Sequence, residues 1–81
     1  MDGGETIAAD DVLDARGLLC PLPVLKARKR LSRMDTGQVL EIRADDPAAI
    51  LDVPFFCMET GHVLLAQGGP PEAQHYLIRK A

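Results

Sequence analysis

Hydrophobic and polar residues follow two different periods along this chain. The residues between 38 and 44 alternate and are rich in β-branched and aliphatic side chains, as is typical of a half-buried strand. Weaker versions of the same pattern predict further strands at residues 12–15, 62–67 and 74–80. The last two flank Gly68-Gly69-Pro70-Pro71, a composition that predicts a hairpin loop.

Two other stretches have the spacing of a helix. In the first, residues 21–34, the apolar stripe is spaced three, four and three and consists of Val24, Ala27, Leu31 and Met34. The second starts at Asp45-Asp46-Pro47, an acidic cap followed by proline, and ends near Thr60 before Gly61. Pro54 would remove a hydrogen bond inside this helix, so we expect the helix to restart there with Asp52 as a second cap.

The predicted order of elements is β-α-β-α-β-β. Two amphipathic helices and four strands fit an α/β (α+β) two-layer sandwich, in which both helices cover one face of a four-stranded mixed sheet. Residues 1–10 contain two glycines and three acids, and we expect a flexible N-terminal tail there. Residues 11–81 then form a single domain, because 81 residues supply one modest core.

Composition narrows the function classes. With 47% hydrophobic and 26% charged residues the chain is of globular type. No apolar run approaches the roughly 18 residues of a membrane span, and the acidic N-terminus is unlike a signal peptide, so we expect a cytoplasmic protein without membrane contact. A net charge of −3 argues against direct nucleic-acid binding. Five of the nine basic residues nevertheless lie between residues 26 and 33, which indicates either a docking face for an acidic protein or a solvated helix face.

Candidate chemistry centres on Cys20, which directly precedes the first predicted helix. Pro21 and Pro23 fall in the first helical turn, where proline is tolerated, and the N–H of Leu22 is free to reach the sulfur. A thiolate there would meet the positive end of the helix dipole, with Arg16 adding to the effect, so we expect a thiol pKa below about 8.5. The alternative is a buried cysteine whose neighbouring prolines only start the helix.

The residues around this cysteine separate a sulfur carrier from a redox enzyme. In a C-x-x-C motif the last residue is the thiol that resolves a mixed disulfide, and here that position is Pro23. Sulfur bound to Cys20 would therefore persist until a partner thiol attacks it. Cys57 lies in an apolar run and is expected in the core, and neither histidine has the spacing of a zinc site, so we expect no metal.

The stretch LDARGLLCPLP (residues 13–23) resembles the signature of the TusA-like (SirA-like) sulfur-carrier family. The resemblance extends over about residues 12–80 and includes ADDPA (44–48), DVP (52–54), FC (56–57), His62 and YLIRK (76–80). It implies a sulfurtransferase in which Cys20 accepts persulfide sulfur from a cysteine desulfurase or another donor and passes it to a downstream relay protein. It also implies the two-layer sandwich, and no cofactor, since the sulfur is held covalently.

Within that family the relay leads to 2-thiolation of tRNA uridine, and other members supply molybdenum-cofactor synthesis or sulfur oxidation. An alternative of a different class is a non-catalytic regulatory or RNA-interaction module. Family docking around the C-P-x-P helix implicates Leu22, Leu25, Arg28 and Asp46. The helical wheel independently leaves Leu22 and Leu25 exposed beside Cys20, with Lys26 and Lys29 on the rim. We expect a monomer that docks transiently on its partners.

Overall fold

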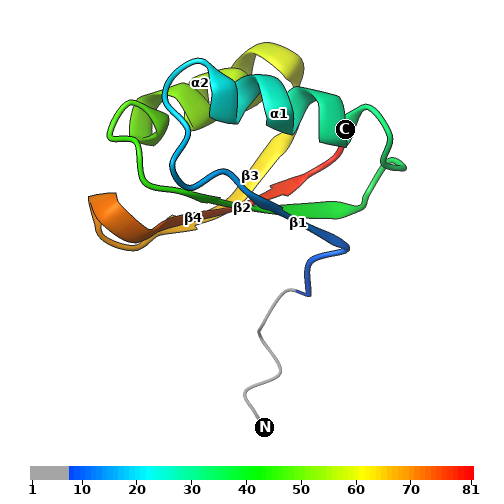
Figure 1. Ribbon diagram of the computed structural model, residues 1–81. Helices are drawn as coiled ribbons and strands as arrows, with labels where there is room; N and C mark the ends of the chain where they lie inside the picture. Colours follow the sequence, from blue (N-terminus) through cyan, green and yellow to red (C-terminus); the bar gives the residue numbers. More distant parts are fainter. Residues whose placement is uncertain (1–7) are drawn as a thin grey trace, which may run out of the picture.

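The computed structural model describes residues 8–81, and its elements follow the predicted order (Figure 1). The chain runs through β1 (Asp11–Asp14), α1 (Leu22–Leu31), β2 (Val39–Ala44), α2 (Ala49–Thr60), β3 (Val63–Gly68), a short 3-10 turn (Pro71–Ala73) and β4 (Gln74–Arg79). The strand and helix order β-α-β-α-β-β is confirmed.

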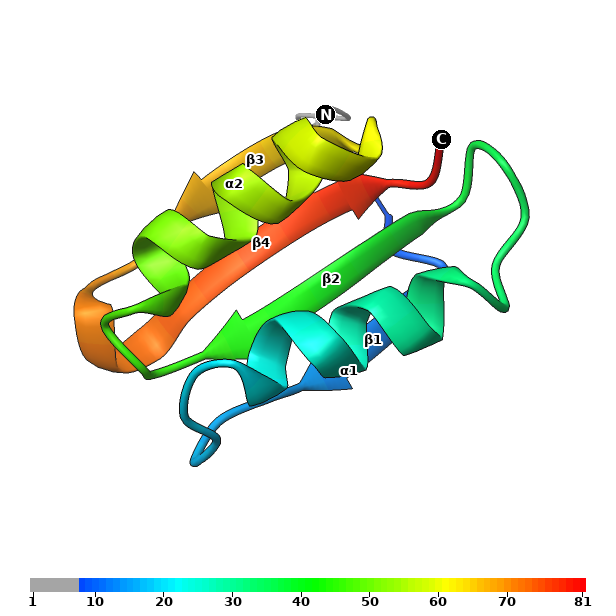
Figure 2. The ribbon, with the colours of Figure 1, turned by 90° about the horizontal axis from the view of Figure 1, so that it is seen from above.

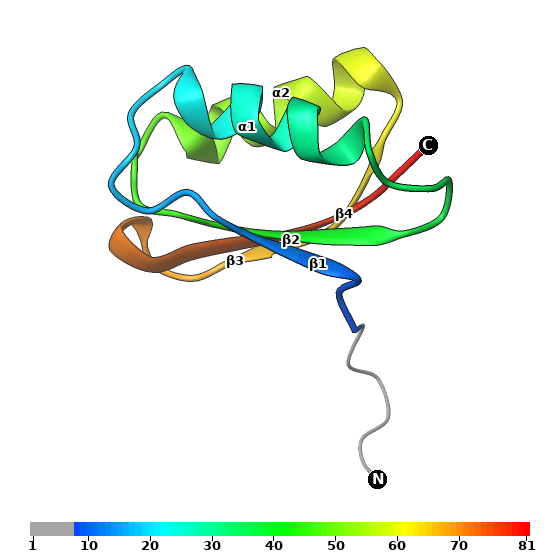
Figure 3. The same cartoon turned by 45° about the vertical axis from the view of Figure 1, so that its right-hand side comes forward.

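The four strands form one mixed sheet with the order β1-β2-β4-β3. β1 is parallel to β2, whereas the β2–β4 and β3–β4 pairs are antiparallel. Both helices lie on the same face of the sheet (Figures 1 and 3), so the two-layer sandwich is confirmed. Figure 2 shows α1 on the side of β1 and β2, and α2 on the side of β4 and β3.

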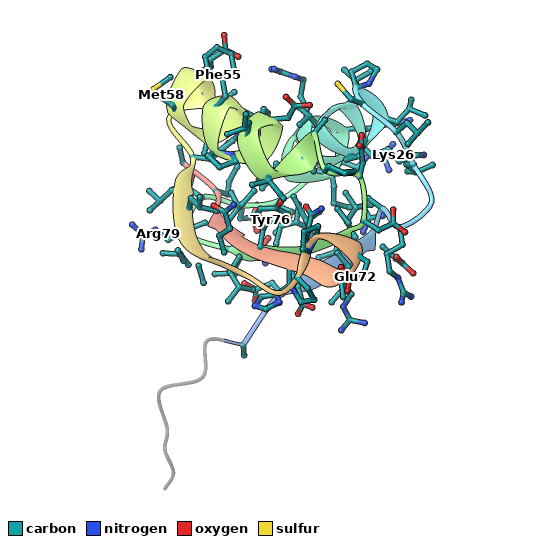
Figure 4. All side chains as sticks on the ribbon, turned by 90° about the vertical axis from the view of Figure 1, so that its left-hand side faces the viewer. Lys26, Phe55, Met58, Glu72, Tyr76 and Arg79 are labelled. Carbon is teal, nitrogen blue, oxygen red and sulfur yellow. The ribbon has the colours of Figure 1, made fainter. Side chains whose placement is uncertain are left out.

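The core lies between these two layers and contains one stripe from each helix. Its strand residues come from alternate positions, because side chains at i and i+2 of a strand share a face. Figure 4 shows Tyr76 in this position, between the helices and the sheet. Burial of a large aliphatic or aromatic side chain contributes about 1.5–3 kcal/mol to stability. The largest fully buried side chains are Tyr76, Phe56, Leu31, Leu40, Ile42, Ile78 and Val53.

α1 is shorter than the sequence predicted, because it ends at Leu31 instead of Met34. The last carbonyl groups of a helix have no partner inside the helix. Here the ammonium group of Lys80 donates to the carbonyl oxygens of Leu31 at 2.7 Å and Met34 at 2.9 Å. A side chain from the C-terminal end of the chain therefore fixes the end of α1.

The predicted restart of the second helix at Pro54 is wrong, since α2 is continuous with Pro54 inside it. Proline at this position cannot donate to the carbonyl oxygen four residues earlier, which is that of Ile50. The side-chain amide of Gln67 on β3 donates to that oxygen instead, at 3.2 Å. This contact from another element offsets part of the loss that proline causes.

The predicted flexible tail lies partly outside the described residues, which begin at Ala8. Asp10, its last residue, is fixed to the sheet: its N–H donates to the carbonyl oxygen of Val39 at 2.8 Å, and its carboxylate accepts the Val39 N–H at 2.7 Å. Over the described part of the chain, neither helix has the length and apolar character that crossing a bilayer requires.

Candidate functional site

Cys20 lies in the loop that connects β1 to α1, and its side chain is exposed. Two carboxylates that follow β2 fasten this loop. Asp45 accepts the N–H of Gly17 at 2.9 and 3.1 Å, and Asp46 accepts the N–H of Cys20 at 2.6 Å. Because β1 and β2 are parallel neighbours, their C-terminal ends lie side by side, and this arrangement brings the acidic pair to the cysteine loop.

A buried polar chain supports Asp46 from the core. The side-chain amide of Gln74 donates to the backbone carbonyl oxygens of Asp46 at 2.9 Å and of Pro71 at 2.7 Å. The hydroxyl of Tyr76 donates in turn to the amide oxygen of Gln74. Tyr76 and Gln74 belong to β4, one of the two central strands, so the cysteine loop is connected to the interior of the sheet.

The start of α1 differs from the sequence prediction in a way that affects the thiol. The N–H of Leu22 donates to the carbonyl oxygen of Leu19 at 2.8 Å, so it is not directed at the sulfur. Pro21 is the cap residue of the helix and the Cys20–Pro21 peptide bond is cis. Cys20 therefore lies one residue before the cap and does not receive the predicted N–H hydrogen bond.

Cys20 lines a pocket of about 200 Å³ between the two helices. Cys20, Pro21 and Val24 line it from the α1 side. From the α2 side come Asp52, Phe55, Phe56 and Glu59. Sequence reasoning missed these four residues as part of the site. The sequence could have indicated them, because α2 has more apolar residues than its buried face needs. Leu51, Phe55 and Met58 lie outside the buried stripe and are exposed.

The pKa of the Cys20 thiol is raised, and the predicted lowering is wrong. The largest cause is the hydrogen bond with the Asp52 carboxylate, followed by desolvation and by the negative charges of Asp52 and Asp46. Arg16, the second group expected to stabilise a thiolate, forms a bidentate ion pair with Asp14 at 2.8 Å instead. The thiol of the free protein is therefore protonated near neutral pH.

The residues predicted to dock partners do not all share one surface. Leu22 and Leu25 are 44% and 51% exposed, as predicted. Phe55 on α2, which lines the Cys20 pocket and is labelled in Figure 4, is 55% exposed. The guanidinium of Arg28 lies 5.1 Å from the centre of the Phe56 ring, at the junction of the two helices.

The other predicted docking residues lie elsewhere. Lys26 and Lys29 line a different groove, on the β1 side of α1. Asp46 is only 9% exposed and both of its carboxylate oxygens accept backbone N–H groups, from Cys20 and from Ala48. In the free protein its contacts are those of a residue that positions the cysteine loop.

Cys57 has a different environment from Cys20. It is 4% exposed in the core under α2, as predicted, and burial raises the pKa of its thiol to about 11. The chain has two cysteines, both of them free. Cys20 is therefore the accessible thiol of this protein.

Together these features define a small α+β sandwich with one exposed cysteine just before the N-terminus of a helix. The sequence profile described as sulfurtransferase TusA matches residues 11–80, which is nearly the whole chain. The chain therefore belongs to the TusA family of sulfur-transfer proteins. Its fold is similar to the crystal structure of a SirA-like protein from Desulfitobacterium hafniense, with a TM-score of 0.75 and 21% identity over 85% of this chain and 95% of that one.

Proposed function

We propose that this protein is a sulfur carrier that accepts persulfide sulfur on Cys20 from a cysteine desulfurase and passes it to a downstream relay protein. The observation that carries the proposal is that the chain has a single accessible thiol. Cys20 is exposed at the mouth of a pocket, and the other cysteine, Cys57, is buried in the core. Without an accessible second thiol in the chain, sulfur on Cys20 stays there until another protein attacks it.

The transfer requires no external oxidant or reductant. The Cys20 sulfur attacks the terminal sulfur of the donor persulfide, a new S–S bond forms on Cys20, and the donor S–S bond breaks. The donor cysteine leaves as a thiolate, which takes up the proton that Cys20 gives up. Asp52 lines the same pocket as the thiol and is the carboxylate that we expect to receive this proton first. The second transfer repeats the same exchange, with the acceptor thiol as the nucleophile.

The exposed apolar residues around the pocket fit a small and transient interface. Phe55 lines the thiol's pocket from α2, and Leu22 and Leu25 are exposed on α1, the helix that follows Cys20. A carrier must release its donor before it meets its acceptor, so the contact belongs at the low end of interface sizes. A few side chains buried at the centre of such an interface supply most of the binding energy.

The final acceptor in this proposal is the machinery that thiolates tRNA uridine, and the protein acts in the cytoplasm as a monomer. Supply of sulfur for molybdenum-cofactor synthesis or sulfur oxidation would use the same loading step on Cys20. The three uses therefore differ in the acceptor and share the carrier chemistry. No cofactor takes part, because Cys20 holds the sulfur covalently.

Loading by a desulfurase tests this proposal. The protein is incubated with a purified cysteine desulfurase and free cysteine, and its intact mass is measured without reductant. The wild type and Cys57→Ser should gain the mass of one sulfur atom, whereas Cys20→Ser should gain none. Equal loading of Cys20→Ser would refute the proposal. Failure of all three proteins to load would instead favour the non-catalytic regulatory or RNA-binding module.

A further inference from the structure

A second groove lies on the opposite side of α1 from the Cys20 pocket. It has a volume of about 190 Å³ and is formed between α1 and the edge strand β1, with Leu13 among its lining residues. The remaining lining residues are all basic: Lys26, Lys29, Arg30 and Arg33. We call these five residues the basic groove. Figure 4 shows Lys26 on the side of the molecule away from Phe55 and Met58.

The basic groove has an excess of positive charge that the acids of residues 8–81 do not neutralise. Arg30 is the one member with an ion pair in residues 8–81: its guanidinium donates to the Asp11 carboxylate at 3.0 Å and to the carbonyl oxygen of Val12 at 3.1 Å. Lys26, Lys29 and Arg33 form no ion pair with any carboxylate of the described chain. Three cationic groups therefore converge on one hollow of a protein whose net charge is −3.

The stability of the fold does not explain this arrangement. Like charges three and four residues apart on a helix repel each other, as Lys26 does with Lys29 and with Arg30. The helix dipole favours basic residues in the last turn, which accounts for Lys29 and Arg30. Lys26 lies before the last turn and Arg33 lies beyond the end of α1, so the dipole accounts for neither. A hollow lined with one sign of charge concentrates ligands of the opposite sign.

We propose that the basic groove binds an acidic segment of a partner protein. From Lys26 to Arg33 the cations span about two helical turns, or roughly 10 Å. Alternate side chains of an extended peptide lie about 6.6 Å apart, so two or three alternate Asp or Glu residues match this length.

A nucleic acid fits the groove less well than a peptide. Single-stranded nucleic acids bind where aromatic side chains stack on their bases. The chain has two Phe, one Tyr and no Trp, and none of its aromatic residues lines this groove.

The open edge of β1 is not free to pair with a peptide strand. The N–H of Val12 donates to the Asp11 carboxylate, and the carbonyl oxygen of Val12 accepts from Arg30. The peptide therefore lies in the groove and does not add a strand to the sheet.

The inference goes beyond the proposed sulfur transfer, because the groove and the thiol face opposite sides of α1. On an ideal helix Lys26 is about 200° from Val24, which lines the Cys20 pocket. A partner with an acidic segment can stay bound at the groove while Cys20 remains open for exchange. Binding at the groove is independent of the thiol, so Cys20→Ser should bind the peptide with unchanged affinity.

The test measures binding of a fluorescent hexaglutamate peptide at low salt, with a hexaglutamine peptide and an oligouridine RNA as comparisons. The groove variant is Lys26→Gln with Arg33→Gln, which leaves the structural Arg30 in place. The matched control is Arg43→Gln with Arg79→Gln, which removes the same charge from exposed positions on two strands. We expect the groove variant to weaken hexaglutamate binding roughly tenfold, as the loss of two exposed ion pairs allows, and the control to change it less than about twofold.

Amide chemical shifts of the wild type should change along α1 and β1 and leave the Cys20 pocket unaffected. Melting temperatures of both variants should stay near that of the wild type. The inference is overturned if hexaglutamate does not bind, if both variants weaken it equally, or if hexaglutamine binds as tightly. It is also overturned if the RNA binds more tightly than hexaglutamate and loses affinity in the groove variant, because the ligand would then be a nucleic acid.

Discussion

Replacing Asp46 with alanine should loosen the cysteine loop. The Asp46 carboxylate accepts the N–H of Cys20 at 2.6 Å and that of Ala48 at 3.2 Å, and the side chain is 9% exposed. Asp46→Ala removes both acceptors and leaves the two N–H groups without them. The loop between β1 and α1 then keeps two carboxylate contacts, from Asp45 to Gly17 and from Asp14 to Arg16.

The magnitude follows from the two hydrogen bonds. A bond to a charged acceptor contributes about 1.5–3 kcal/mol, and the longer bond to Ala48 adds little to this. We expect Asp46→Ala to lower the free energy of unfolding by about 2–3 kcal/mol. For a domain of this size each kcal/mol changes the melting temperature by about 4–8 °C, so the expected decrease is about 8–24 °C. Desulfurase loading of Cys20 should slow in parallel, because the thiol is no longer held at the pocket.

Thermal unfolding followed by circular dichroism measures the loss of stability. Intact mass measured against time gives the rate of loading. Asp35→Ala is the matched control, since Asp35 is an exposed carboxylate whose side chain accepts no hydrogen bond in residues 8–81. A melting temperature of Asp46→Ala equal to that of Asp35→Ala would refute the reasoning. If loading fell while the melting temperature stayed unchanged, Asp46 would act as the partner contact that the sequence suggested.

Three further changes test other parts of the site. Asp52→Asn removes the main cause of the raised pKa of Cys20, so the free protein should react faster with iodoacetamide at pH 7. Loading by the desulfurase should nevertheless slow, because the proton acceptor is lost. Faster loading would argue against Asp52 as the proton acceptor. Cys57→Ser should load like the wild type. Since burial raises the pKa of Cys57 from 9.0 to about 11, the wild type should lose stability as the pH rises through this range, and denaturant titrations at pH 8 and pH 11 should show a smaller loss in Cys57→Ser. Leu25→Asp should keep the melting temperature and weaken desulfurase binding at both low and high salt, because it introduces a charge into the apolar contact; unchanged binding would show that the partner docks elsewhere.

The sequence predicted the elements of this fold because their periodicities are local. The stripe of α1 and the alternation of β2 depend on neighbours within a few residues. Ala27 and Leu31 are buried as predicted, whereas Val24 and Met34 are only partly buried. Pro54 shows the limit of local reasoning. Its effect depends on Gln67, thirteen residues later on β3, which satisfies the carbonyl group that proline leaves free. No local pattern reveals that contact.

The site shows the same division between local and tertiary information. Cys20 was identified from its immediate neighbours, and its exposure agrees with that prediction. The sign of its pKa shift depends on Asp52, which comes from the other helix and reaches the thiol only because α1 and α2 pack side by side. The sequence treated Asp52 as a helix cap. The helix dipole alone predicts a lowered pKa, but the Asp52 carboxylate has the larger effect on the Cys20 thiol and raises it.

Transfer of labelled sulfur through Cys20 tests the central claim most directly. The protein is loaded with isotopically labelled sulfur from cysteine, separated from the desulfurase and from small molecules, and mixed with a purified relay protein of the tRNA-thiolation pathway. Peptide mass spectrometry then locates the label on both proteins over time. The account predicts that the label starts on the peptide that contains Cys20, leaves it, and appears on an acceptor cysteine in equal amount. Label that stays on Cys20, or that is found on Cys57, would contradict it.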